Sequence, residues 1–514
     1  MKHFGLSKEV LLLLLLGIVI RIPVLVSPVS EGYRNAQTAA LTANMIENGK
    51  LRFDPIAPWR GDLDARLVLE FPAYNLLVLA VDAIPGVPLD TAGRLVSLVL
   101  WILSFIVLQF LWRWILPSGA RLWANLLFVL APLNWYAGAA FMPETLVQLL
   151  SITFILLCLV YTKHKNLGVC AGLILVAGLG LLVKFPAFVH LGLFAALVWI
   201  DRLGWRSLFR PALLAGALLL VGSLVAWGRY ADSVNSLHFD YWTGLRNLEG
   251  FIQVDRSRLS ASYWLPLLAY NTTLLLGVVG APLAVLGFWC TLKQAPNCFG
   301  PRVLLYLLAS LFAYWIAWSK AAPAQSYYNL PNTVFLAAMF GLGCNWVTRW
   351  MEQKEATLWF RRSLAVIFVA LLFAFSAAYW QYLYQPDRVT VAVASWLRDN
   401  TQAQDLVILQ PRHNPAAMDY EHQPLLSHAA GRKTWIWTRT TPEGERARAL
   451  RTSRYIVVTH PSRESGMFER IRQAIKGPTP IAPEAIDKSH PGLLAEILSG
   501  EDYTIFGFKN PTPH

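Results

Sequence analysis

Two carboxylates follow apolar runs in positions where they could act on a substrate. Glu31 lies five residues beyond the apolar run 6–26 and is followed by Tyr33 and Arg34, and Glu144 lies at the end of a later apolar run. A carboxylate at the end of a membrane-spanning helix meets a lipid-borne substrate at the water boundary, where it can act as a general base. The other interpretations stay open: Glu31 as a helix N-cap or a partner of Arg34, and Glu144 as a charge that favours a helix N-terminus.

Cations and hydroxyls follow other apolar runs. Lys184 ends one run in the sequence Lys-Phe-Pro, and Lys320 precedes a segment that contains Tyr327 and Tyr328. A lysine beside hydroxyl donors suits a lipid phosphate. The alternatives are a lysine that snorkels to the membrane surface and a belt of interfacial tyrosines. Arg21, within the first run, is predicted to snorkel.

Two further charge pairs lie in one polar stretch. Arg66 and Glu70 are four residues apart, which fits either an ion pair on a helix face or contacts to phosphate and sugar. Asp62 and Asp64 have a spacing that could hold Mg²⁺ or Mn²⁺. Because Arg and Lys side chains can neutralise a lipid monophosphate, we predict no metal site and no cofactor, with Asp62 and Asp64 as solvated charges.

The composition is typical of a polytopic membrane protein. Of the 514 residues, 55% are hydrophobic and 15% are charged, and the mean hydropathy is +0.44, whereas soluble proteins carry roughly 25% charged residues. The net charge of +13 does not indicate nucleic acid binding, because residues 385–514 contain 16 basic and 14 acidic residues. The rest of the positive charge lies between apolar runs, as the positive-inside rule expects.

Eleven runs are long enough to be predicted as spans. They are residues 6–26, 91–115, 121–141, 143–161, 167–183, 185–200, 211–230, 264–290, 302–319, 331–350 and 362–384. With a cytoplasmic N-terminus, every short inside loop is basic, which predicts a multi-pass inner-membrane protein. Glu31 and Glu144 then share the outer face. The run 71–85 breaks this scheme if it spans, so we predict a re-entrant or surface-lying helix, with a short tilted span as the alternative.

The composition changes at residue 385. Residues 1–384 are predicted to form the transmembrane catalytic domain, and residues 385–514 an extracytoplasmic α/β domain. Four runs have the alternation of strands, at 405–410, 434–437, 455–459 and 503–508, with helical stretches at 389–400, 443–451 and 465–475. All five cysteines precede residue 385, so no disulfide is expected in the second domain.

Several of these segments together resemble one family. The chain looks like the GT-C glycosyltransferases, in particular the protein O-mannosyltransferases and the bacterial aminoarabinose lipid A transferases. The resemblance covers most of residues 6–350. The similar motifs are Glu31-Gly32-Tyr33, Glu70-Phe71-Pro72-Ala73-Tyr74, Gly93-Arg94-Leu95-Val96-Ser97, Met142-Pro143-Glu144, Lys184-Phe185-Pro186 and Tyr327-Tyr328-Asn329-Leu330-Pro331.

The resemblance implies a polyprenyl-phosphate sugar as donor and a lipid, glycan or protein acceptor outside the cytoplasm. It makes Glu31 the catalytic acid/base and Glu144 a second carboxylate of the site. Lys184, Tyr327 and Tyr328 become phosphate or acceptor contacts. Many relatives carry Asp in place of Glu31, and some carry a lysine in the motif around Glu70, for which Arg66, Lys184 and Lys320 are substitutes.

The alternative function is a transporter or flippase for lipids or solutes. That class favours charges and broken helices near the middle of the membrane, whereas here the charges gather at the outer ends of the runs. The sequence therefore favours the glycosyltransferase.

Overall fold

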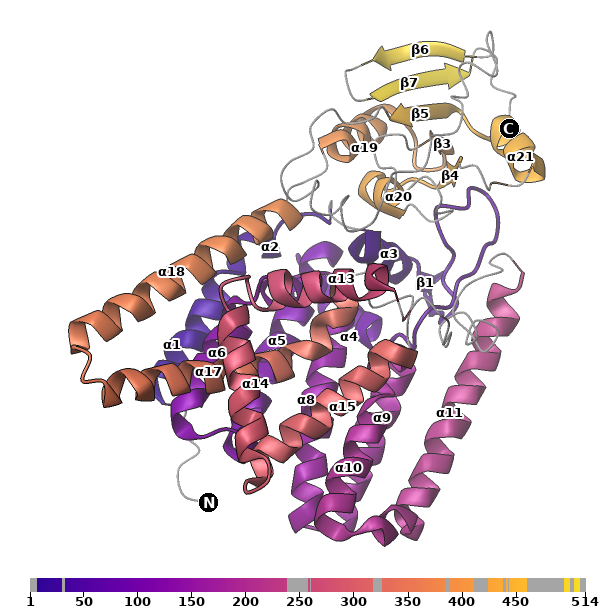
Figure 1. Cartoon of the computed structure of the whole chain (residues 1–514). Helices are drawn as coiled ribbons and strands as arrows, with labels where there is room; N and C mark the ends of the chain where they lie inside the picture. Colours follow the sequence, from indigo (N-terminus) through magenta and orange to yellow (C-terminus); the bar gives the residue numbers. More distant parts are fainter. Residues whose placement is uncertain are drawn as a thin grey trace.

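A computed structural model shows a large helical bundle with a mixed sheet at one end (Figure 1). The structure describes residues 7–29, 33–237, 258, 260–317, 326–384, 388–410, 424–437, 441, 443–459, 494–499 and 503–508. Among them, seven helical segments are long and apolar enough to cross a membrane. These are α5 (Leu89–Ile115), α8 (Glu144–Lys163), α9 (Leu167–Phe188), α11 (Pro211–Asn235), α15 (Phe299–Ala317), η5 (Ser326–Asn332) with α17 (Thr333–Gln353), and α18 (Leu358–Leu383).

The remaining helices are shorter and pack between or across the long ones. They are α1 (Lys8–Val19), α2 (Ile22–Leu25), α3 (Tyr33–Ala43), α4 (Ala73–Asp82), α6 (Ser118–Leu130), α7 (Pro132–Ala137), α10 (Leu191–Leu203), η1 (Trp205–Phe209), α13 (Ala261–Tyr270), η4 (Asn271–Leu275) and α14 (Ala281–Gln294). At about 1.5 Å per residue, α4 is too short to cross a bilayer. It packs beside α5.

Four predicted spans are not single helices. One of them, the run 185–200, covers the end of α9 and most of α10, with His190 between the two helices. The run 121–141 is divided into α6 and α7 at Pro132, which removes an amide donor and keeps the preceding Ala131 non-helical. The run 264–290 is divided into α13, the π-helical turn η4 and α14, with Gly277 and Val278 both at positive φ. The run 6–26 is interrupted near Arg21, between α1 and α2.

A five-stranded sheet carries the order β4-β3-β5-β7-β6. Strands β3, β4 and β5 are parallel, whereas β5 pairs with β7 and β7 with β6 in antiparallel fashion. The strands are β3 (Val407–Gln410), β4 (Thr434–Ile436), β5 (Tyr455–Thr459), β6 (Leu494–Ser499) and β7 (Tyr503–Phe508), and the helices beside them are α19 (Arg388–Asn400), α20 (Pro424–Ala430) and α21 (Glu443–Thr452). All four expected strands are present, and β6 was not predicted. The helix expected at 465–475 lies outside the described residues.

The sheet rests on the polar loop that precedes α4. The Thr434 amide donates to the Pro58 carbonyl at 2.8 Å, and the Gly61 amide donates to the Thr434 carbonyl at 2.8 Å. Gly61 has a φ of +59°, and a Cβ there would lie 2.0 Å from the Trp435 ring, so a glycine is required at this approach. Trp59 of the loop shares a buried cluster with Leu397. The core of the C-terminal part therefore extends across residue 385. A short hairpin, β1 (Ile46–Glu47) and β2 (Lys50–Leu51), also belongs to the polar region before α4.

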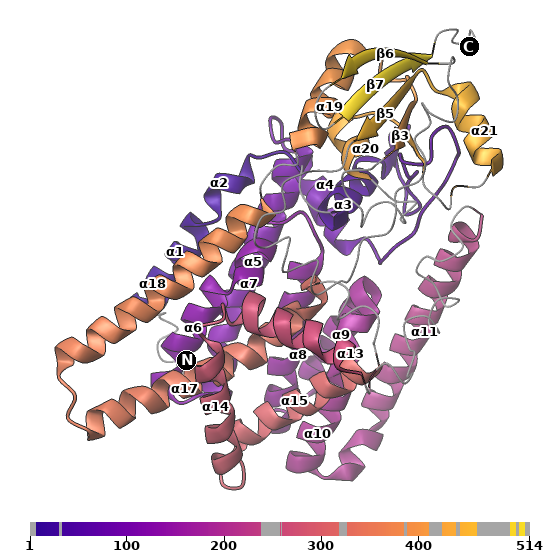
Figure 2. The same ribbon diagram turned by 45° about the horizontal axis from the view of Figure 1, so that its top comes forward.

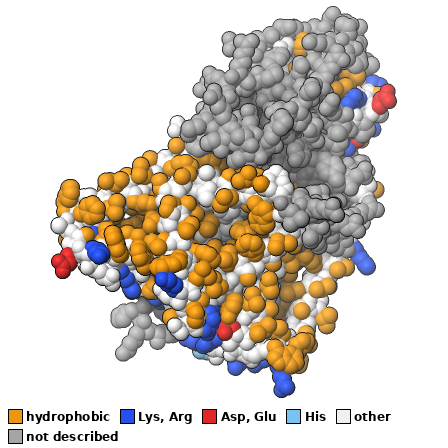
Figure 3. All heavy atoms as spheres, viewed as in Figure 1, with side chains coloured by type: hydrophobic (Ala, Val, Ile, Leu, Met, Phe, Trp, Pro, Cys, Tyr) orange, Lys and Arg blue, Asp and Glu red, His pale blue; other side chains and the backbone are white. Residues whose placement is uncertain are grey.

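Basic side chains gather at the end of the bundle away from the sheet. On the face shown in Figure 3, the blue Lys and Arg atoms border the lower edge of a broad hydrophobic surface. At this end Lys163 lies 4.4 Å above the Trp114 ring, so the C-terminal ends of α5 and α8 are neighbours. The surface and its basic edge are those expected of a protein embedded in a bilayer.

Candidate functional site

Four charged side chains converge at the sheet-facing end of the bundle. We call Arg34, Glu70, Glu144 and Lys184 the charge cluster. Arg34 is the second residue of α3 and donates from Nη2 to Glu70 Oε1 at 2.5 Å and from Nη1 to Gln37 Oε1 at 3.0 Å. Its Nε lies 3.6 Å from Glu144 Oε1. One arginine thus contacts both carboxylates.

A break in α9 places Lys184 in this cluster. Lys184 has non-helical φ and ψ of −157° and 77°, two residues before Pro186. A helix would bond the amide of residue 186 to the Leu182 carbonyl, but proline has no amide proton. The Phe71 amide donates to that carbonyl instead, at 3.0 Å. The freed carbonyl therefore anchors the segment that carries Glu70 beside Lys184.

The lysine is held between two carboxylates. Lys184 Nζ forms a direct ion pair with Glu144 Oε1 and lies 3.8 Å from Glu70 Oε1. The side chains of Lys184 and Glu144 are both only 3% exposed. Glu144 begins α8 after Pro143, where the helix dipole favours a negative charge. Its second oxygen, Oε2, is buried and has no hydrogen-bond partner among the described residues.

Two aromatic rings cover the lysine. The Nζ atom of Lys184 lies 4.8 Å from the Tyr327 ring centre and 4.6 Å from that of Tyr328, within the range of a cation–π interaction. The 3-10 helix η5 that carries both tyrosines is tied to η4, because Asn332 Nδ2 donates to Asn271 Oδ1 at 2.9 Å. The broken run 264–290 thus supports the tyrosines.

Electrostatics favour the charged forms of Arg34 and Glu70. Partial burial opposes the charge on Glu70, but the neighbouring Arg34 and Lys184 outweigh it and hold the pKa of the carboxyl below its usual value. Burial likewise opposes the charge on Arg34, and Glu70 and Glu144 outweigh it, so its pKa is raised well above the ordinary value. With two cations and two anions, the cluster is close to neutral.

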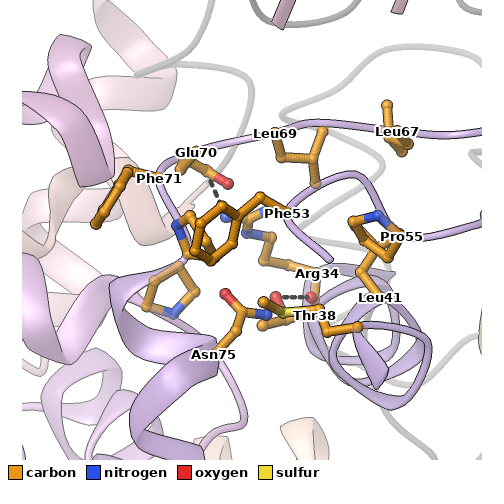
Figure 4. Close-up of a pocket in the computed structure, with 13 residues that line it drawn as sticks. Arg34, Thr38, Leu41, Phe53, Pro55, Leu67, Leu69, Glu70, Phe71 and Asn75 are labelled. Atoms are coloured by element: carbon orange, nitrogen blue, oxygen red, sulfur yellow. Dashed lines mark hydrogen bonds and ion pairs between the residues drawn. The ribbon is translucent and has the colours of Figure 1, made fainter. Parts of the chain in front are cut away.

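A pocket opens beside the Arg34–Glu70 pair (Figure 4). In the close-up Arg34 and Glu70 meet on one side, joined by a dashed line, and Thr38 and Asn75 lie below them. The pocket is otherwise walled by apolar side chains from α3, from the loop before α4 and from the start of α8. These residues are Leu41, Met45, Phe53, Pro55, Leu67, Leu69, Phe71, Pro72 and Pro143. It offers a mostly apolar wall with a charged base.

The structure brings together most of the predicted site residues that it describes. Besides the four members of the charge cluster, it places Tyr327 and Tyr328 there. Glu31 and Lys320 lie outside the described residues, as does the side chain of Tyr33, although Tyr33 begins α3. The proposed roles of these three residues stay predictions.

Arg66 is engaged elsewhere. Its guanidinium lies 3.1 Å from Glu47 Oε2 and 3.2 Å from Asp64 Oδ1, and it donates to the Asp54 carbonyl at 3.2 Å. Residues 66–70 are not helical, so the helix-face pair of Arg66 with Glu70 is wrong. In this structure Glu70 takes Arg34 and Lys184 as its partners.

Arg21 does not snorkel, which corrects the prediction. Its side chain is fully buried, stacks 3.9 Å from the Trp101 ring centre and donates to the carbonyls of Gly17 and Asn134 at 2.7 and 2.9 Å. The breaks between α1 and α2 and between α6 and α7 explain this difference. Carbonyls near each break are available to accept from the guanidinium.

The acidic pair with metal-binding spacing is used in ion pairs. Asp62 makes two hydrogen bonds with Arg448, both 2.9 Å long, and Asp64 faces Arg66. In the described ranges no group of three or more His, Cys, Asp or Glu residues is arranged to hold a metal ion. Asp62 is therefore a docking residue for α21 in this structure rather than a solvated charge.

Comparison with solved structures defines the fold. The chain is similar to ArnT from Cupriavidus metallidurans bound to undecaprenyl phosphate, with 13% identity, a TM-score of 0.65 and 98% of each chain covered. It is also similar to the oligosaccharyltransferase AglB from Archaeoglobus fulgidus in complex with an inhibitory peptide and a dolichol-phosphate, with 12% identity, a TM-score of 0.59 and 88% of this chain and 69% of that chain covered. For the mycobacterial arabinofuranosyltransferase AftD the identity is 13%, the TM-score 0.52 and the coverage 100% of this chain and 42% of that chain.

These likenesses extend over nearly the whole length of the chain, which has the fold of the GT-C glycosyltransferases. The sequence matches no family model and no curated protein. The expected fold class is thus confirmed at the level of a helical membrane protein with GT-C structural neighbours.

Proposed function

We propose that the protein is a membrane glycosyltransferase that moves a hexosyl or pentosyl group from a polyprenyl-phosphate donor to an acceptor outside the cytoplasm. The observation that carries this proposal is the charge cluster itself. Two buried cations meet two carboxylates at the end of a bundle with the GT-C fold. The solved neighbours ArnT and AglB are bound to polyprenyl or dolichol phosphates, which supports the same class of lipid carrier here.

The proposed reaction assigns a role to each side of the site. The acceptor hydroxyl oxygen attacks the anomeric carbon, the bond from that carbon to the phosphate oxygen breaks, and Glu31 takes the hydroxyl proton. The lipid phosphate leaves with the bonding electrons, and Lys184 and Arg34 stabilise its charge. Since Lys184 now faces Glu144 and Glu70, the phosphate must take the place of a carboxylate at Nζ. The unpartnered Oε2 of Glu144 makes that carboxylate the one with capacity to turn toward an acceptor.

The tyrosines and the pocket suit the two ends of the donor. Tyr327 and Tyr328 cover Lys184, and we propose that they shield the phosphate from water, which strengthens its pairing with the lysine. Tyr33 and Lys320 are proposed as further substrate contacts. The pocket beside Arg34 and Glu70 has the charged base and apolar wall that suit a sugar joined to a less polar group.

A test of the proposed function is release of lipid phosphate from a panel of polyprenyl-phosphate sugars. The purified protein should turn over one of them in the presence of membrane acceptors. Glu31→Gln should abolish this turnover while the donor still binds, because the change keeps the shape of the side chain and removes the base; general-base catalysis contributes roughly 10²–10⁴-fold. Transport of the lipid without release of phosphate would instead identify a flippase, and normal turnover of Glu31→Gln would place the base elsewhere.

We further propose the orientation and domain division inferred from the sequence. The N-terminus is cytoplasmic, and residues 1–384 form the catalytic membrane domain with about eleven crossings of the inner membrane. Residues 385–514 form an α/β domain on the extracytoplasmic side of that membrane. Cys298, the one exposed cysteine, lies in a loop at the basic end, and Ala447 is exposed on α21. In intact cells a membrane-impermeant thiol reagent should label Ala447→Cys in a Cys298→Ser background and should not label Cys298 in the wild type. The reverse pattern would overturn the orientation.

A further inference from the structure

The segment that enters α3 is held by two side chains from α5. Asp90 Oδ2 accepts a hydrogen bond from the Val29 amide at 2.7 Å. One turn further along the helix, the fully buried Arg94 donates from Nε to the Ser27 carbonyl at 3.0 Å and from Nη2 to the Pro28 carbonyl at 3.1 Å. Three consecutive residues are thus fixed at their backbone polar groups. Residues four apart on a helix share a face, so this clamp is built into α5.

The clamp has a third member from the other end of the chain. The second oxygen of Asp90, Oδ1, lies 2.8 Å from Nε2 of His428 on α20. Because a carboxylate only accepts, the imidazole donates from Nε2. The side chains of His428 and Asp90 are only 11% and 19% exposed, which limits competition from water. Asp90 therefore joins α20 to the backbone of Val29.

The same helix α20 also packs against α3. Leu426 and Ala430 of α20 share a buried cluster with Ala40 and Leu41 of α3, and Leu425 packs against the cluster that contains Val29. Both views place α20 directly above α3 (Figure 2). α20 is therefore linked to the chain on both sides of residues 30–32. Before them, His428 reaches the Val29 amide through Asp90, and after them α20 packs directly against α3, which carries Arg34.

We propose that α20 is a positioning element of the site and that His428 is its coupling residue. His428 holds the backbone of residues 27–29 in place through Asp90. The helix that carries His428, α20, holds α3 in position through the apolar packing described above. The link to catalysis rests on the proposed function, because residues 27–29 lead to Glu31 and α3 carries Arg34. Covering the site would require only packing of α20 against α3. The hydrogen bond from His428 to Asp90 of α5 adds a direct link to the clamp.

The test uses the full-length protein in detergent and measures backbone hydrogen exchange in the peptide that covers residues 27–35. His428→Ala removes the donor, and His428→Gln keeps an N–H donor of similar reach. The matched control is Arg448→Ala, which breaks another contact of the C-terminal part, with Asp62, and leaves the clamp intact. We expect exchange at Val29 to accelerate about tenfold or more in His428→Ala and to stay near the wild-type rate in His428→Gln and Arg448→Ala.

Turnover supplies the second measurement. His428→Ala should lower kcat about tenfold or more with the KM for the donor unchanged, because small misplacements of catalytic groups slow chemistry more than binding, and His428→Gln should recover it. Unchanged exchange in His428→Ala, or equal acceleration in Arg448→Ala, would overturn the proposal. If the wild type turns over no donor, the proposed function fails, and exchange alone decides whether His428 positions this segment.

Discussion

The charge cluster and the Arg448–Asp62 ion pair beneath the sheet both join basic side chains to carboxylates, but they differ in their surroundings. In the cluster, Lys184 and Glu144 are 3% exposed. Beneath the sheet, Arg448 and Asp62 are 47% and 30% exposed, although their two hydrogen bonds of 2.9 Å have the better geometry. Geometry alone therefore does not distinguish a site from a surface contact.

Burial and incomplete pairing make the difference. A buried ion pair recovers the cost of leaving water only when its polar atoms are satisfied, yet Oε2 of Glu144 has no partner among the described residues. An exposed pair stays solvated, loses little when broken and gains little when made. Among the described residues the cluster therefore holds one unsatisfied acceptor, Glu144 Oε2, and one unsatisfied donor, Arg34 Nε, whereas the Arg448–Asp62 pair joins α21 to the loop before α4.

The largest expected effect is at Lys184. Lys184→Met keeps the apolar length of the side chain but removes the nearer of the two cations beside the buried Glu144, so that only Arg34 Nε remains, at 3.6 Å. This change should destabilise the protein by up to about 3–5 kcal/mol. Donor affinity should fall by about 1.5–3 kcal/mol, the value of a charged hydrogen bond. Thermal unfolding and donor binding measured on the same sample give the two effects separately.

The control is the double variant Lys184→Met with Glu144→Gln. It removes both charges, so stability should recover while donor affinity does not. Recovery of both would show that Lys184 acts only by keeping Glu144 in place. If the single variant binds donor like the wild type, the lysine has no phosphate contact.

A second difference should appear in the pH dependence of stability. Because Arg34 and Lys184 hold the pKa of Glu70 below its usual value, the stabilisation from this carboxylate is fully present above that usual value and is lost as the pH falls through the lower, folded-state pKa. Melting temperatures recorded from pH 7 downward should therefore fall in the wild type. In Glu70→Gln this component should be absent, which makes the curve flatter in the acid range.

Glu443→Gln serves as the matched control for this measurement. Glu443 is an exposed carboxylate in the first turn of α21, and its replacement should leave the acid limb unchanged. A Glu70→Gln curve that runs parallel to the wild type would show that the pair with Arg34 contributes nothing to acid sensitivity.

A smaller effect is expected beneath the sheet. Arg448→Ala and Asp62→Ala should each cost about 0.2–1 kcal/mol of stability, the range for solvent-exposed pairs, and the cost should shrink in high salt because exposed charges are screened. Chemical denaturation at low and high ionic strength measures both. A loss as large as that of Lys184→Met would mean that exposure does not separate the two regions.

The smallest expected effect is that of chelation. The carboxylate of Asp62 is engaged by Arg448, and the charge on a lipid monophosphate can be met by Lys184 and Arg34. Turnover should therefore survive exhaustive EDTA treatment unchanged. Loss of turnover with rescue by Mg²⁺ or Mn²⁺ would move Asp62 and Asp64 into the site and would erase the distinction between the two regions.

Some of the site could be read from the sequence because the signal is local. Glu70, Glu144 and Lys184 each lie beside an apolar run and within two residues of a proline. Arg34, in contrast, lies eight residues beyond the run 6–26, in a polar stretch. Proline alone is ambiguous, however. Pro132 separates α6 from α7, whereas Pro266 lies inside α13 without ending it. Hydropathy therefore found the apolar runs, but it did not find their divisions.

The sequence by itself determined the class of the protein: apolar runs with basic loops dictate a helical membrane protein, and alternating runs after residue 400 dictate strands. Only the tertiary structure decided the partners. Arg34 and Glu70 are 36 residues apart, Lys184 and Glu144 are 40 apart, and His428 and Asp90 are 338 apart. Ion pairs and hydrogen bonds have short range, so packing of whole helices chooses among many candidate charges. The same packing buried Arg21 and turned Arg66 away from the site.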